Sequence, residues 1–256
     1  MKRLLIVLAF SSISTTSFGA SPRQHGMPQP QTITVSEAPK AVEKTDAEKG
    51  EDHLRKICAQ GKSALKNRGV VSRAFPGQSV CTAIPDDLPR TIIAAEHIWI
   101  PEKKRGETST SVVNSVLSKI GRQGSRAYAG DRSRTEATGL AQIQSGSYHL
   151  LRRRYHEARL NPSFQAGMTD QTNVVAAIYL HCDAALAILT ERQRAALLRS
   201  PNLMRRYLVA AYNAGAGKAR AALESGSLVR MDERRLPRET LTHLEKGRMY
   251  LAVAAG

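Results

Sequence analysis

The sequence is poor in aromatic residues and in cysteine, which limits the folds and sites that it can form. Aromatic residues make up 5% of the 256 positions, so we expect helices packed through aliphatic side chains rather than a β-sandwich. The three cysteines lack the spacing of a zinc site. The sequence also has no nucleotide-binding glycine fingerprint, no His-Glu-x-x-His motif and no nucleophile elbow. It therefore implies no metal and no cofactor.

Long apolar runs are lacking as well. No segment reaches the roughly 20 apolar residues that a membrane-spanning helix needs. At the N-terminus, Lys2 and Arg3 precede a short apolar run over residues 4–10, and small or polar residues then lead to Ala20. This pattern is typical of a secretory signal peptide. We therefore predict a signal peptide over residues 1–20, export to the periplasm and no stable membrane anchor.

Acidic residues are scarce relative to basic ones. The chain has 38 Lys and Arg against 22 Asp and Glu, and its formal net charge of +16 falls to +14 if Lys2 and Arg3 leave with the signal peptide. Such a charge favours anionic partners, and an exported protein meets cell-wall polymers and the membrane surface. The basic clusters are not interleaved with aromatic residues, which argues against nucleic acid as the partner.

The rest of the chain divides into three segments by composition. Residues 21–50 are polar and rich in Pro, Gln and Thr, so we predict a disordered linker. Residues 51–85 form a small accessory segment with one helix, in which Cys58 and Cys81 either pair in the oxidising compartment or stay free. From residue 86 to 256 the pattern is that of a helical domain. Within it, the nearly apolar stretch 173–189 predicts the central buried helix, and Cys182 there predicts a buried free thiol.

Four short motifs occur in the helical domain. They are Glu-His-Ile-Trp-Ile-Pro at 96–101, Gly-Leu-Ala-Gln-Ile at 139–143, Ala-Tyr-Asn-Ala-Gly at 211–215 and Leu-Pro-Arg-Glu-Thr at 236–240. In this order, the motifs resemble those of the Slt-type lytic transglycosylases. The resemblance covers residues 86–251. The chain departs from the family pattern at His97, where Ser is usual, at Ala141, where Met is usual, and at His243, where Tyr is usual.

This resemblance implies a mainly α, lysozyme-like (Slt-type) helical domain that acts on peptidoglycan glycan strands. Enzymes of this family cleave the bond between N-acetylmuramic acid (MurNAc) and N-acetylglucosamine (GlcNAc) with a single Glu as acid and base. The acetamido group of the substrate assists, and the product carries a 1,6-anhydro end. Some relatives serve envelope-spanning secretion or conjugation machinery, so such an apparatus is a further expected partner.

The resemblance implies that Glu96 is the catalytic acid. The residues themselves point the same way, because an apolar environment favours the protonated carboxyl that such a reaction requires. Residues 92–95 and 98–100 flank Glu96 with apolar side chains, and no other acid in the chain has comparable flanks.

The same resemblance implies a substrate-binding set at the remaining motifs: Gln142, Tyr212, Asn213, Glu239 and His243. Amides and aromatic rings suit sugars, but each of these residues also has a purely structural interpretation in a turn, a core or a helix cap. In particular, Glu239 either orients Tyr212 or caps a helix.

A second alignment register stays open at this stage. Counting back from Gly139 at the commonest family spacing puts the acid position on Gly124, and Ser133 then falls near the substrate acetamido group. In that register the protein is a catalytically inactive lysozyme-like peptidoglycan-binding or scaffold protein. We prefer Glu96, which requires a long insertion before Gly139. Asp131 and Glu136, near the glycine turn, are the fallback acids.

Overall fold

A computed structural model describes residues 43–100, 109–133 and 136–255 of the protein. The predicted signal peptide and residues 21–42 of the predicted linker lie outside the described residues. The described part is mainly α, as predicted, and its β-structure consists of isolated bridges. No helix in this part is long and apolar enough to cross a membrane. The α-helices are α1 Asp46–Asn67, α2 Leu88–His97, α3 Ser109–Gln123, α4 Ser145–Arg154, α5 Phe164–Thr169, α6 Gln171–Ala187, α7 Glu191–Leu198, α8 Pro201–Ala214, α9 Ala216–Ser225 and α10 Arg238–Ala254.

Helix α1 begins inside the range predicted as linker. Thr45 caps it with a capping box: its hydroxyl accepts from the backbone N–H of Glu48, and the Glu48 carboxylate accepts from the backbone N–H of Thr45 at 2.7 Å. These reciprocal bonds satisfy amide groups that the start of a helix otherwise leaves open. The predicted linker boundary at residue 50 is therefore wrong, because residues 46–50 are polar in composition but helical.

Two glycines allow α1 and α3 to pack with their backbones in contact. A Cβ added at Gly50 would lie 1.9 Å from the carbonyl oxygen of Leu117, and one added at Gly121 would lie 2.0 Å from that of Asp46. Only glycine permits so close an approach. Helix α1 also packs on α6, where a Cβ at Gly61 would lie 2.5 Å from Val175.

Residues 51–85 are therefore not a separate accessory segment. Leu54 and Leu65 belong to the same hydrophobic core as the later helices. The loop after α1 is tied to α6 by the buried carboxylate of Asp183, which accepts from the Ser72 hydroxyl, from the Arg73 backbone N–H at 2.7 Å and from Tyr155 at 2.8 Å. The described residues from 43 onward form one packed unit, so the predicted division at residue 86 is corrected.

The three cysteines are all free and buried, so the possible pairing of Cys58 with Cys81 is not realised. Burial raises the pKa of the Cys58 thiol to about 12 and that of Cys81 to about 11. Thiols of this kind are poorly nucleophilic. Pairing was one possibility for a segment without a core of its own, and here both side chains share the main core. Cys182 is a buried free thiol, as predicted.

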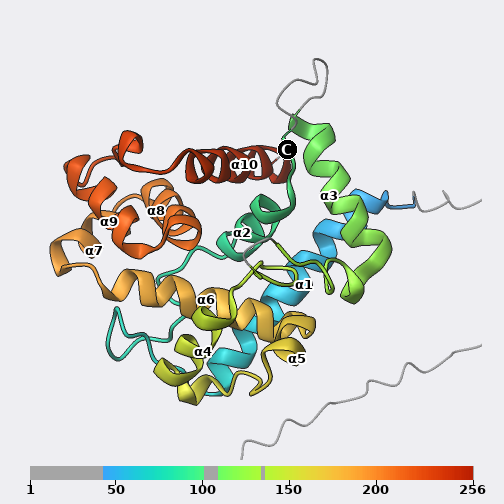
Figure 1. Ribbon diagram of the computed structural model, residues 1–256, viewed down its shortest axis with the longest axis horizontal. Helices are drawn as coiled ribbons and strands as arrows, with labels where there is room; N and C mark the ends of the chain where they lie inside the picture. Colours follow the sequence, from blue (N-terminus) through green and yellow to red (C-terminus); the bar gives the residue numbers. More distant parts are fainter. Residues whose placement is uncertain (1–42, 101–108, 134–135, 256) are drawn as a thin grey trace, which may run out of the picture. The chain divides into compact units, whose positions relative to one another are not determined.

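Helix α6 is the central helix, as predicted, and residues 173–180 are buried along their whole length. Figure 1 shows α6 crossing the middle of the unit, and both α1 and α8 pack against it. Helix α10 packs against both α2 and α8. This arrangement brings the C-terminal ends of α2 and α8 and the start of α10 close to the irregular segment 136–144, and the candidate site forms there.

Candidate active site

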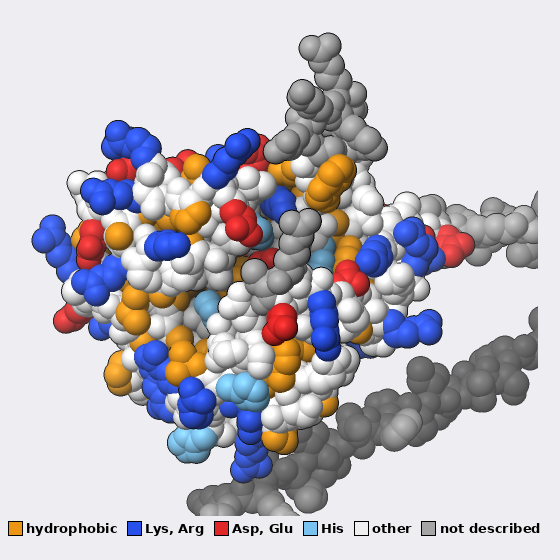
Figure 2. All heavy atoms as spheres, viewed as in Figure 1, with side chains coloured by type: hydrophobic (Ala, Val, Ile, Leu, Met, Phe, Trp, Pro, Cys, Tyr) orange, Lys and Arg blue, Asp and Glu red, His pale blue; other side chains and the backbone are white. Residues whose placement is uncertain are grey.

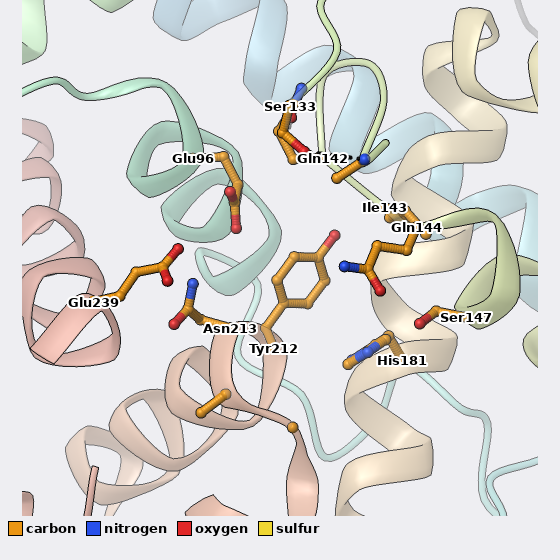
Figure 3. A pocket seen from close by; sticks show the side chains of 13 residues that line it. Glu96, Ser133, Gln142, Ile143, Gln144, Ser147, His181, Tyr212, Asn213 and Glu239 are labelled. Atoms are coloured by element: carbon orange, nitrogen blue, oxygen red, sulfur yellow. Dashed lines mark hydrogen bonds between the residues drawn. The ribbon is translucent and has the colours of Figure 1, made fainter. Parts of the chain in front are cut away.

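A cavity of about 450 Å³ opens where α2, α6, α8, α10, Ser133 and the segment 137–147 meet. Figure 3 shows the side chains that point into it. The cavity brings together five of the six residues that the sequence analysis assigned to the site: Glu96, Gln142, Tyr212, Asn213 and Glu239. Its other lining residues are Ser133, Ala137, Ile143, Gln144, Ser147, His181, Ala214 and Gly215. Segments up to 143 residues apart in sequence thus contribute to one hollow.

Glu96 is the second-to-last residue of α2, and its side chain is 14% exposed. The apolar residues 92–95 and Ile98, which flank it in sequence, are buried in the core, while Trp99 is 69% exposed. Most side chains that line the cavity are polar. The apolar flanks of Glu96 therefore anchor the helix in the core, and the carboxyl itself enters a polar hollow rather than the apolar cleft that we expected.

His97, which replaces the usual Ser of the family pattern, ties the end of α2 to the glycine turn. Its Nε2 lies 2.8 Å from the carbonyl oxygen of Leu140, and its ring stacks on Tyr128 with centroids 3.6 Å apart. Burial lowers the pKa of His97 to about 4, so the ring is neutral at pH 7. Because a carbonyl can only accept, Nε2 carries the ring proton.

The turn at residues 139–143 depends on two residues with positive φ. Gly139 has φ +77°, and a Cβ there would lie 2.8 Å from the carbonyl oxygen of Met168. Gln142 has φ +47°, and its side-chain Nε2 donates to the carbonyl oxygen of Gly139 at 2.9 Å. Gln142 therefore braces the turn as well as lining the cavity.

Tyr212 fastens α8 to the same turn. Its hydroxyl donates to the carbonyl oxygen of Ala141 at 2.7 Å, next to the Leu140 carbonyl that His97 holds. Burial raises the pKa of Tyr212 well above its usual range, and the nearby charge of Glu96 acts in the same direction. The phenol thus stays protonated and engaged. The hydroxyl bonds to Ala141, so the suggested orientation of Tyr212 by Glu239 is not observed.

Asn213 connects α8 to α10 through both ends of its amide. Its Oδ1 accepts from the Thr240 hydroxyl at 2.7 Å, and its Nδ2 lies 3.2 Å from Nδ1 of His243. On the other side of the ring, Nε2 of His243 lies 3.4 Å from Oε2 of Glu96. His243 is buried and does not line the cavity. The expected direct contact of His243 with substrate is therefore corrected: this residue lies behind Glu96.

Two residues in or beside the cavity were missed in the sequence analysis. His181 projects from α6 into the cavity, its ring centroid lies 4.8 Å from that of Tyr212, and burial lowers its pKa to about 4. Its Nδ1 is buried without a hydrogen-bond partner within the described residues. Lys246 follows His243 by one turn of α10; burial lowers its pKa, and the charges of Glu96 and Glu239 oppose that shift. An isolated His in the apolar stretch 173–189 was the signal that could have revealed His181.

The residues of the second register lie elsewhere, with one exception. Gly124 begins a short 3₁₀ turn, and its carbonyl accepts from Gln171 outside the cavity lining. Asp131 lies 3.6 Å from Lys119 and is half exposed, and Glu136 is exposed. Neither fallback acid lines the cavity, whereas Ser133 does. Among the lining residues that the structure describes, the carboxylates are Glu96 and Glu239.

Comparison with known proteins adds no assignment to this geometry. The chain matches no protein-family model, and no curated protein matches it. The candidate site is therefore argued from its residues.

The two neutral histidines of the site should make the fold sensitive to mild acid. Between pH 6.5 and about pH 4, His97 and His181 are protonated in the unfolded chain but neutral in the folded protein. The free energy of unfolding therefore falls as the pH falls through this window. Each shift corresponds to at most roughly 3 kcal/mol. Urea unfolding at several pH values should show this loss in the wild type. It should be smaller in His181→Leu and unchanged in the control His156→Gln, an exposed histidine; equal losses in all three would contradict the assignment.

Proposed function

We propose that the protein is an exported peptidoglycan lytic transglycosylase with a lysozyme-like helical domain and Glu96 as its acid and base. The observation that carries the proposal is the convergence of motifs that are distant in sequence on one cavity, with the Glu96 carboxyl inside it. His97 and Tyr212 hold α2 and α8 to adjacent carbonyls of the glycine turn, so the arrangement is rigid around that carboxyl. Rigid positioning of the reacting group is what such catalysis requires.

The polar lining suits a saccharide. Gln144 and Ser147 face the cavity on the side opposite Glu96 and Glu239 (Figure 3), where hydroxyl and acetamido groups of sugars can bind. In the proposed reaction, Glu96 gives its proton to the bridging glycosidic oxygen as the bond to the MurNAc anomeric carbon breaks. The acetamido oxygen of the substrate forms a bond to that carbon in place of the leaving oxygen. The Glu96 carboxylate next removes the proton of the 6-hydroxyl, whose oxygen displaces the acetamido oxygen and closes the 1,6-anhydro ring.

The surface charge fits an anionic polymer as substrate. Figure 2 shows Lys and Arg side chains spread over the visible face rather than collected in one patch. A distributed positive field retains a protein on a polyanion without a single docking point, and this attraction weakens with salt. Export to the periplasm and contact with a secretion or conjugation apparatus belong to the same proposal.

Hydrolysis is the second candidate, and Glu239 is the observation in its favour. Most glycosidases use two carboxylates that flank the scissile bond. Glu239, at the start of α10, lines the same cavity as Glu96, and Figure 3 shows both carboxylates directed toward Asn213. The inactive-binder alternative requires the acid position to fall on Gly124, which lies outside the cavity lining, and we therefore rank it lower.

Digestion of purified sacculi by the protein without residues 1–20, followed by mass spectrometry of the soluble products, tests the proposal. We expect muropeptides that end in 1,6-anhydro-MurNAc. Products with reducing MurNAc ends, heavier by one water, would instead identify a hydrolase that uses Glu239. Binding to sacculi with no released product would identify the inactive alternative.

A further inference from the structure

The imidazole of His243 lies between a donor and an acceptor on one side and Glu96 on the other. Its Nδ1 lies 3.2 Å from Nδ2 of Asn213 and 3.2 Å from the carbonyl oxygen of Glu239. Its Nε2 is buried and forms no hydrogen bond within the described residues; the acceptor that it approaches is Oε2 of Glu96, at 3.4 Å. The position of the ring proton therefore decides whether an N–H donor or an unprotonated nitrogen faces the Glu96 carboxylate.

Asn213 decides this question. Because Oδ1 of Asn213 accepts from the Thr240 hydroxyl at 2.7 Å, Nδ2 is the end of the amide that faces His243. An amide nitrogen can only donate, so in the neutral ring Nδ1 of His243 accepts and the ring proton is on Nε2. The competing acceptor, the Glu239 carbonyl, already lies at the i−4 position for the backbone N–H of residue 243 in α10.

We infer that His243 is a positioning residue whose Nε2–H forms a hydrogen bond to Oε2 of Glu96 during the reaction and leaves Oε1 as the oxygen that carries and transfers the proton. The chain Thr240–Asn213–His243 fixes the tautomer, and the tautomer distinguishes the two carboxyl oxygens. A neutral carboxylic acid has one carbonyl and one hydroxyl oxygen, and a donor at Oε2 makes Oε2 the carbonyl. When Oε1 releases its proton, the bond at Oε2 persists and His243 keeps its own proton. This inference rests on the proposed function.

The tautomer can be observed in the protein alone. In ¹⁵N-labelled wild type, at a pH where the ring is neutral, the nitrogen shifts of His243 should show the proton on Nε2. In Asn213→Leu the donor to Nδ1 is gone, so the proton should move to Nδ1 and bond to the Glu239 carbonyl. A wild-type ring protonated on Nδ1 would overturn the inference, as would an unchanged tautomer in Asn213→Leu.

Activity on sacculi or on soluble glycan chains supplies the second readout. His243→Leu should lower kcat by about 10- to 100-fold with KM changed less than about 3-fold, because it frees the reacting group without touching the cavity lining. His243→Gln, which keeps an N–H at the reach of Nε2, should recover most of that loss. The control His156→Gln, at an exposed histidine, should match the wild type.

The outcomes separate the inference from the proposed function. An active wild type whose kcat survives His243→Leu overturns the role of His243 and leaves the function standing. A wild type without released product overturns the function, and the role of His243 with it. If His243→Leu does not fold, the wild-type tautomer and the activity of His243→Gln still test the inference. Activity of His243→Gln no higher than that of Glu96→Gln would contradict it.

Discussion

Replacing Glu96 by Gln should reduce the release of anhydromuropeptides from sacculi by about 10³-fold or more. Removing a positioned general acid costs about 10²–10⁴-fold, and here the same group also acts as the base. Glutamine has the same size and keeps an oxygen toward His243 Nε2, which lies 3.4 Å from the native carboxylate. The fold should therefore persist. Product release measured by mass spectrometry, beside a thermal melt, checks both parts of the expectation.

The matched control for this variant is Glu136→Gln. Glu136 is exposed near the glycine turn and does not line the cavity. Glu136→Gln makes the same chemical change at one of the two fallback acids, so the activity of this variant should equal that of the wild type. The assignment of Glu96 would be wrong if Glu96→Gln kept full activity, and more so if Glu136→Gln lost it.

Replacing Gly50 by Ala should destabilise the protein by roughly 3 kcal/mol or more, the upper range for overpacked sites. The new Cβ would lie 1.9 Å from the carbonyl oxygen of Leu117, a backbone atom that cannot rotate away, so α1 and α3 must separate. For a domain of this size the melting temperature should fall by about 6–12 °C. Thermal unfolding followed by circular dichroism measures the shift.

Gly217→Ala is the control for this prediction. A Cβ at Gly217 meets no atom within 4 Å, and the residue lies on the exposed surface of α9. This substitution should be neutral or slightly stabilising, because alanine favours helix. A Gly50→Ala protein that melts with the wild type would mean that α1 does not pack closely on α3.

Helix positions followed from local sequence pattern to a useful degree. The apolar stretch 173–189 gave the central helix α6, because a helix buried on all sides is apolar on all sides. Pro89 marked the start of α2, where proline has a suitable backbone angle and lacks only a free amide. The start of α1 was missed because its polar composition concealed a capping box and the contact of Gly50 with Leu117, 67 residues later in the chain.

The candidate site was predictable in some of its members but not in their roles. Motif spacing selected five of the residues that line the cavity, yet Asn213 and His243 turned out to engage each other across two helices. The apolar neighbours of Glu96 in sequence face the core, because successive positions on a helix point in different directions. Side chains adjacent in sequence are therefore poor guides to the environment of a carboxyl.

The sequence by itself determined the helical class, the central helix and the set of motif residues, because periodicity and turn chemistry are local properties of the chain. Only the tertiary structure decided that α1 joins the main core, that Cys58 and Cys81 stay free and that His243 lies within reach of Glu96. These features depend on contacts between segments far apart in the chain, where single atoms such as the missing Cβ of Gly50 set the distance. The local sequence pattern does not predict such distances.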